Sequence, residues 1–101
     1  MLTNFRTYHL AVTFYRSCAR PKLPYHLKDQ LLRASSSVVL NLAEARGKSS
    51  LKEQRRFFDI ASASLRESQS ILELGIVQGE VLDMGDHLAA SLYKLIKAIV
   101  V

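Results

Sequence analysis

A run of positive charge lies between residues 46 and 56. Five of these eleven residues carry a cation, and Glu53 is the one acid among them. Guanidinium and ammonium groups bind phosphate oxygens, and several of them together make affinity fall steeply with salt. The run predicts either a patch that contacts phosphate and shape without reading bases, or a solvated surface that only keeps the protein soluble. The five cations are Arg46, Lys48, Lys52, Arg55 and Arg56.

Two polar residues, Asn41 and Glu44, lie beside the apolar positions of the preceding segment. Asn41 comes three residues after Val38 and next to Leu42, and Glu44 follows one turn later. A buried polar group without a hydrogen-bond partner costs about 1–3 kcal/mol. We therefore expect both residues to be at least partly buried and to fix helix register and oligomer geometry, as a lone Asn does in coiled coils. A direct role in ligand binding is the alternative.

The residue types that most often carry catalysis or bind metals are scattered along the chain. His9, His26 and His87 lie on three different segments, and the pair Asp83 and His87, four residues apart, is far short of a metal site. The sequence contains no Glu-x-x-His motif, no cysteine–histidine cluster and no glycine-rich phosphate loop. Cys18 is the single cysteine, and we expect it to pack as a small hydrophobe. The sequence predicts no enzyme, no metal site and no cofactor.

Four helical segments, separated by three short breaks, must position these residues. Pro21 and Pro24 form the first break, because proline lacks the amide hydrogen that a helix needs. Gly47 ends the second helix. Ser50-Leu51-Lys52-Glu53 matches a capping box, in which serine and glutamate side chains satisfy free amides. Gly75 is a mild interior weakness, and Gly79 is the expected stop of the third helix. The expected helices run from Thr3 to Cys18, from Tyr25 or Leu27 to Ala45, from Ser50 to about Gln78, and from Asp83 or Asp86 onward.

Apolar side chains recur every three or four residues in each segment, as on helices with one buried face. The first stripe is Phe5, Tyr8, Val12, Tyr15 and Ala19, widened by Ala11 and Phe14. The other main stripes are Leu27, Leu31, Ala34, Val38, Leu42 and Ala45; Leu51, Phe58, Ala61, Leu65, Ser68, Leu72 and Ile76; and Leu88, Leu92, Leu95 and Ile99. Each of the two middle segments carries a second stripe as well. These are Leu32, Val39 and Ala43, and then Phe57, Ile60, Ser64, Ile71 and Leu74.

Helices of this kind joined by short loops pack as antiparallel neighbours. The sequence therefore predicts an all-α protein, an antiparallel up-down-up-down four-helix bundle that forms one domain over residues 1–101. The second stripes exceed what a single four-helix core uses, and this excess predicts association with copies of the chain.

Composition agrees with a helical bundle and with anionic partners. Only 4 glycines and 2 prolines occur in 101 residues, too few for the many turns of a sandwich or barrel. The formal net charge of +5 favours nucleic acid or acidic protein surfaces. There is neither a signal peptide nor an apolar run long enough to span a bilayer, so we expect a cytoplasmic protein with no membrane partner.

Two stretches resemble a known bacterial family. Residues 29–44, DQLLRASSSVVLNLAE, look like the hallmark of the four-helix-bundle proteins related to the 23S rRNA intervening-sequence protein. A second hallmark of that family is similar to FFDIA at residues 57–61, followed by Ala63-Ser64-Leu65 and Glu67. The resemblance spans about residues 5–80. Ala45 and Ala63 stand where the family often has glycine, and changes this small leave the fold intact.

The resemblance implies a homopentameric, barrel-like ring of bundles with a basic surface. The family includes the accessory variability determinant of diversity-generating retroelements, whose ring binds a reverse transcriptase and RNA, and also members encoded within rRNA intervening sequences. For this chain we expect a non-enzymatic homo-oligomer that engages RNA, DNA or a partner such as a reverse transcriptase through Arg46–Arg56. The alternative is a structural or protein-interaction module that binds no nucleic acid.

Overall fold

The computed structural model describes residues 2–100 of the chain, with side chains for residues 5–100. It consists of α1 (Leu2–Cys18), α2 (Tyr25–Arg46), α3 (Leu51–Leu74) and α4 (Glu80–Ala98). No β-strand occurs within residues 2–100, so the predicted all-α class is confirmed. None of these helices has the length and the apolar character that crossing a bilayer requires.

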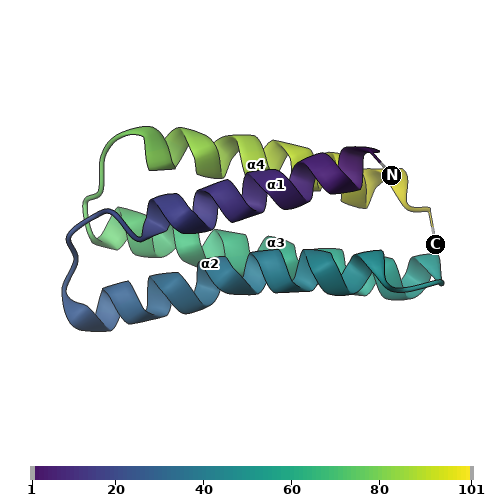
Figure 1. Cartoon of the computed structure of the whole chain (residues 1–101), viewed down its shortest axis with the longest axis horizontal. Helices are drawn as coiled ribbons and strands as arrows, with labels where there is room; N and C mark the ends of the chain where they lie inside the picture. Colours follow the sequence, from purple (N-terminus) through teal and green to yellow (C-terminus); the bar gives the residue numbers. More distant parts are fainter. Residues whose placement is uncertain (1, 101) are drawn as a thin grey trace.

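The four helices lie lengthwise beside one another, and consecutive helices run in opposite directions (Figure 1). α1 packs against α2 and α4, and α3 packs against the same two helices, which closes the bundle around one core. The most extensive contact is between α2 and α3, where small residues such as Ala61 and Ser64 let the helices approach closely. One end of the bundle holds the α2–α3 turn, the start of α1 and the end of α4.

The core confirms the central part of the predicted stripes on the last three helices and corrects the one on α1. The two end members of the predicted α3 stripe, Leu51 and Ile76, are 52% and 80% exposed. Leu31, Val38 and Leu42 of α2 are fully or almost fully buried, as are the central stripe residues of α3 and α4. On α1, however, the buried side chains are Thr7, Ala11, Phe14, Ser17 and Cys18, whereas Phe5 is 49% exposed. The predicted main stripe is therefore wrong, and the residues expected only to widen it form the core.

The third helix ends earlier than its sequence predicts. α3 stops at Leu74, and Gly75 caps it. Ile76 then takes the left-handed conformation, with φ of 54°. Its amide donates to the Glu73 carbonyl at 3.0 Å, and the Val77 amide donates to the Leu72 carbonyl at 3.0 Å, the two bonds of a Schellman ending.

Gly75 lies at the end of α3 and not in its interior, where the sequence predicts it, and it has a packing role there. A β-carbon at residue 75 would come within 2.3 Å of Leu23 Cδ2, from the connection between α1 and α2. Only glycine therefore lets Leu23 pack against the end of α3 as it stands. The expected continuation of the helix to Gln78 is wrong because this contact and the turn at Ile76 end it.

The fourth helix begins earlier than predicted. α4 starts at Glu80 behind Gly79, whose φ of 104° is a conformation that glycine adopts without strain. The predicted N-caps, Asp83 and Asp86, lie inside the helix. Val81 explains the earlier start, because it is 6% exposed and adds one apolar turn to the core. Glu80 and Asp83 now lie in the first turn, where their negative charge favours the helix dipole.

Candidate nucleic-acid interface

The α2–α3 turn is held by hydrogen bonds that follow from local sequence. Ser50 caps α3, and its Oγ accepts from the Glu53 amide at 3.0 Å, as the capping box predicts. The reciprocal half of that box is replaced, because the Glu53 carboxylate pairs with Arg56. Gln54 Nε2 donates to the Lys48 carbonyl at 2.9 Å and ties α3 back to the turn. The turn therefore presents the basic run from a fixed backbone.

We call Arg46, Lys48, Lys52, Arg55 and Arg56 the turn cluster. Arg46, Lys52 and Arg56 are exposed, whereas Lys48 and Arg55 are half-buried. The prediction that all five lie on the surface thus holds for three of them.

Three carboxylates lie within reach of the turn cluster. Arg56 Nε is 3.1 Å from Glu53, Arg55 Nε is 3.5 Å from Asp59, and Lys48 Nζ is 3.7 Å from Glu44. All three pairs are solvent-exposed contacts between neighbouring turns of one helix or its end, and such pairs contribute little stability. Helix geometry thus adds Glu44 and Asp59 to the single acid, Glu53, found inside the run.

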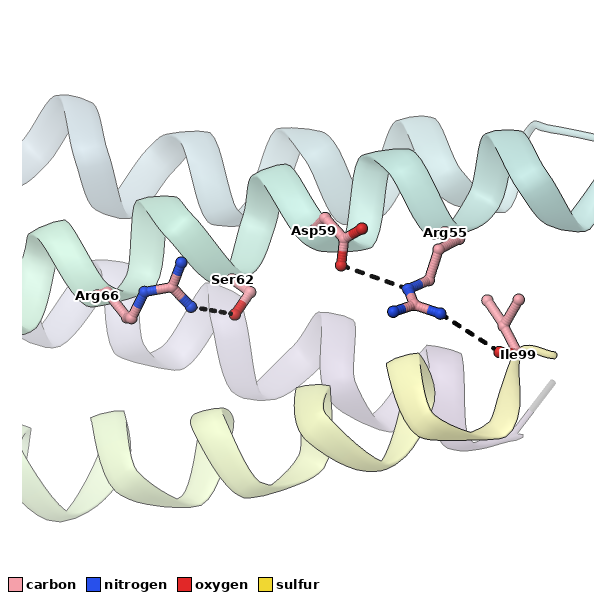
Figure 2. Close-up of polar contacts among 5 residues, drawn as sticks. All are labelled: Arg55, Asp59, Ser62, Arg66 and Ile99. Carbon is pink, nitrogen blue, oxygen red and sulfur yellow. Dashed lines mark hydrogen bonds and ion pairs between the residues drawn. The ribbon is translucent and has the colours of Figure 1, made fainter. Parts of the chain in front are cut away.

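Arg55 connects two helices. Its Nη1 donates to the Ile99 carbonyl at 3.4 Å, just beyond the end of α4, while its Nε faces Asp59 (Figure 2). Three turns further along the same helix, Arg66 Nη1 donates to Ser62 Oγ at 3.1 Å. Arg55 is therefore partly a structural residue, because it satisfies a carbonyl at a helix C-terminus.

Three aromatic rings make four cation–π contacts with residues of the turn cluster. The Arg46 guanidinium lies 5.5 Å from the Phe5 ring centre and 5.6 Å from that of Tyr8. The Phe57 ring lies 5.2 Å from Lys48 Nζ and 4.7 Å from the Arg56 guanidinium. Such contacts orient a cation without neutralising it. Among the described residues, Lys52 alone in the turn cluster has neither a carboxylate nor a ring partner.

Sequence reasoning did not include these three rings in the site. Phe57 could have been considered, because it stands beside Arg56 in the sequence, although consecutive helix residues do not share a face. Phe5 and Tyr8 could not, because forty residues separate them from Arg46 and only the α1–α2 packing brings them together.

The fixed charges of the chain are unevenly distributed along the bundle. The half that holds the α2–α3 turn comprises residues 5–10, 36–62 and 89–100. It contains eight of the fourteen lysines and arginines but only three of the nine aspartates and glutamates. The opposite half is left with six of each. The whole formal charge of +5 therefore belongs to the turn half.

The predicted polar pair, Asn41 and Glu44, is separated in the structure. Asn41 is half-buried, and its Nδ2 donates to the Ser37 carbonyl at 2.8 Å and to Ser37 Oγ at 3.0 Å. Ser37 Oγ in turn lies 2.9 Å from Ser64 Oγ, so this network joins α2 to α3. Glu44 is exposed and faces Lys48. The prediction that Glu44 is at least partly buried is wrong for the single chain, because residue 44 lies on the side of α2 that faces away from the core.

Residues suited to metal binding or nucleophilic chemistry do not gather. Within the described part of the chain, no three histidines, cysteines or acidic residues lie together as a metal site requires. Cys18 is 0% exposed, which confirms its packing role. Burial raises the pKa of its thiol to about 11, although a hydrogen bond with Ser35 and the charge of Lys28 act in the opposite direction.

Comparison with known families identifies a family for this chain. The sequence model of the family described as 23S rRNA-intervening sequence protein matches residues 5–99. Comparison with curated proteins and with solved structures gives no match.

Proposed function

Because the chain belongs to the 23S rRNA-intervening sequence protein family, we propose that it assembles with copies of itself and binds nucleic acid through backbone phosphates at the turn cluster. The assembly we propose is a ring, most simply a pentamer. The chain acts by binding in this proposal and carries out no reaction.

The observation that carries this proposal is the charge difference between the two halves of the bundle. A charge of +5 confined to one end attracts a polyanion far more strongly than the same charge spread evenly over the surface. At 0.1 M salt the fields of separate charges reinforce one another only within about 10 Å. Arg46, Lys52 and Arg56 are exposed there and can reach phosphate oxygens. In a ring with parallel bundles the positive ends of all copies would share one face.

Exposed apolar side chains on the middle helices support self-association. Leu40 of α2 is 62% exposed, and Leu74 and Ile60 of α3 are 71% and 37% exposed. Single exposed leucines are ordinary, but these three lie on the two helices for which the sequence predicts an excess of apolar positions. Ile60 and Leu74 belong to the second stripe predicted on α3, whereas Phe57 and Ile71 of that stripe pack within the single chain. Copies of the chain that packed along α2 and α3 would cover them.

A second candidate is a protein-interaction module without affinity for nucleic acid. One observation favours it: Lys48, Arg55 and Arg56 already face carboxylates, which reduces what the turn cluster offers a phosphate. A reverse transcriptase as the protein partner stays a prediction from the family resemblance.

RNA binding by the purified, assembled protein tests the proposal. Fluorescence anisotropy with a labelled single-stranded RNA, and separately with duplex DNA, should give sequence-tolerant binding that is strong only near 50 mM salt. The variant R46Q/K52Q/R56Q removes the three exposed cations and spares Arg55. We expect it to weaken binding at every sequence and to lower the slope of log K against log salt by about 2 for RNA, since each phosphate contact contributes about 0.7.

The matched control is R16Q/R20Q/K22Q, which removes three exposed cations from the balanced half. It lowers the net charge equally and should leave the salt slope near that of the unmodified chain. Equal losses in both triple variants would mean that net charge alone drives binding. No association with RNA or DNA near 50 mM salt would overturn the proposal and leave a protein as the partner.

A further inference from the structure

A second group of cations lines a groove between α1 and α4. The groove encloses about 430 Å³ and is lined by Arg6 and Leu10 from α1 and by His87, Ala90, Ser91 and Lys94 from α4. This volume is in the range of small-ligand sites. Three of the six lining residues carry nitrogen donors at their tips, and none of the six is acidic.

The groove differs from the turn cluster in the absence of carboxylate partners. Within the described residues, Arg6, His87 and Lys94 have no ion pair, hydrogen bond or aromatic contact. Two acids of α4 stand close to His87 in the sequence, Asp86 directly before it and Asp83 one turn earlier, and neither lines the groove. A phosphate that enters here competes with no carboxylate of the lining, whereas in the turn cluster it competes with Glu44, Glu53 and Asp59.

The walls of the groove are held in place by packing and by a hydroxyl contact. Thr7 Oγ1 and Ser91 Oγ lie 2.5 Å apart and join α1 to α4. Leu10 is half-buried against the core, so the groove has a firm apolar wall beside its donors. Arg6 and Lys94 come from opposite helices and can approach one oxyanion from two sides, as phosphate recognition by several donors requires.

We propose that the α1–α4 groove binds a phosphate group, and that in the working protein this is a backbone phosphate of the same nucleic acid. Arg6 and Lys94 supply the charge, and His87 and Ser91 supply further donors. This inference rests on the proposed function. It adds a contact on the α1–α4 side, so the nucleic acid passes along the side of the turn half as well as across its end.

The test compares two double variants in the RNA anisotropy assay. R6Q/K94Q removes the groove cations, and R16Q/K97Q removes one exposed cation from each of the same helices outside the groove. We expect R6Q/K94Q to weaken binding about tenfold near 50 mM salt and to lower the salt slope by about 1.4, the sum of two contacts. R16Q/K97Q should change both quantities much less. Circular dichroism and light scattering check that both variants fold and assemble.

The outcomes separate this inference from the function on which it rests. If the unmodified protein binds RNA and R46Q/K52Q/R56Q weakens binding while R6Q/K94Q does not, the groove proposal alone is overturned. Equal losses for R6Q/K94Q and R16Q/K97Q also overturn it, because net charge then explains the effect. No RNA binding by the unmodified protein overturns both proposals.

A titration with inorganic phosphate distinguishes the two sources of the ligand. Amide resonances of His87 and Ser91 should shift in the ¹H–¹⁵N spectrum of the unmodified protein and stay unchanged in R6Q/K94Q. The same resonances should shift on addition of RNA. Shifts with phosphate but not with RNA would make the groove a site for a free phosphate compound and would overturn the nucleic-acid assignment.

Discussion

Ile76 is a strained residue on the surface of the turn between α3 and α4. The left-handed conformation costs an L-residue roughly 1–2 kcal/mol, and a branched β-carbon makes it less favourable. Helices usually end on glycine at this position, but here glycine stands one residue earlier, where Leu23 leaves no room for a β-carbon. The Ile76 side chain is 80% exposed, so burial in the single chain does not offset the strain.

Replacing Ile76 by glycine should therefore stabilise the fold. We expect the Ile76→Gly variant to raise the free energy of unfolding by about 1 kcal/mol, after the greater freedom of glycine in the unfolded chain is subtracted. Urea denaturation with an unchanged m-value measures this. Ile76→Ala is the control, because it removes the exposed side chain but keeps the β-carbon and the strain. If alanine stabilises as much as glycine, the exposed side chain and not the backbone is responsible.

The thiol of Cys18 should be inert in the folded protein. Its pKa is raised from the ordinary 9.0 to about 11 by burial, and the thiolate is the reactive form. At pH 8 we expect no alkylation by iodoacetamide over a time in which the urea-unfolded chain reacts completely, as mass spectrometry can record. Between pH 9 and 11 the unfolded chain loses this proton while the folded chain keeps it, so this thiol makes stability fall as pH rises. Rapid labelling of the folded chain at pH 8 would contradict the burial.

At the scale of elements, α2 and α3 are joined by a polar seam within an otherwise apolar contact. Ser37 Oγ and Ser64 Oγ form its centre, and Asn41 extends it along α2. Each hydrogen bond contributes only about 0.5–1.5 kcal/mol to stability. A shift of one helix along the other would leave these polar groups without partners, so the bonds fix the register of α2 against α3. This role is the one predicted for Asn41 from its place beside the apolar stripe.

Substitution of Asn41 by leucine tests whether the seam sets register or binds a ligand. We expect Asn41→Leu to change the oligomer mass or the urea midpoint more than it changes RNA affinity. Gln30→Leu makes the same amide-to-leucine change at an exposed position of α2 outside both apolar stripes and should change neither. Normal assembly with lost RNA binding would show that Asn41 contacts the ligand.

Local signals in the sequence predict most of the four helices, and long-range contacts account for the errors. Ser50 and Gly47 mark their helix ends because each acts through its own neighbours. On α1, residues 5, 8, 12 and 15 repeat at three and four, and so do residues 7, 11, 14 and 18, so spacing alone cannot choose the buried set. At the end of α3, Leu23 from about fifty residues earlier occupies the space that a β-carbon at residue 75 would need.

The same distinction holds for the candidate site. The five cations and the pairing of neighbouring turns can be read from the sequence, since Arg55 and Asp59 stand four apart on one helix. The contact of Arg46 with Phe5 depends on how α1 packs beside α2. The α1–α4 groove could not be predicted either, because Arg6 and Lys94 come from the two ends of the chain.

At the scale of the whole molecule, one end is positive and the other is electrically balanced. This arrangement affects assembly as well as binding, because copies that gather their positive ends repel one another. Apolar contacts along α2 and α3 must outweigh that repulsion in the proposed ring. Higher salt should therefore favour assembly while it weakens nucleic-acid binding.

A charge placed among the exposed apolar side chains should disrupt assembly. We expect light scattering to give a multiple of 11.4 kDa for the unmodified chain and a mass near 11.4 kDa for Leu40→Lys. Tyr93→Lys is the matched control, since Tyr93 is 63% exposed on α4, close to the 62% of Leu40 on α2. An unmodified chain that has a mass of 11.4 kDa at micromolar concentration would refute self-assembly.

The even number of helices brings the start of α1 and the end of α4 to the same end as the turn cluster (Figure 1). A peptide joined to either helix is thus tethered beside the cations, at an effective concentration in the millimolar range for a short flexible linker. An acidic tag there would compete with RNA as an intramolecular ligand, and a basic tag would mimic extra affinity. A label carried by the α1–α2 connection, 40 Å along the bundle at the balanced end, would avoid both effects.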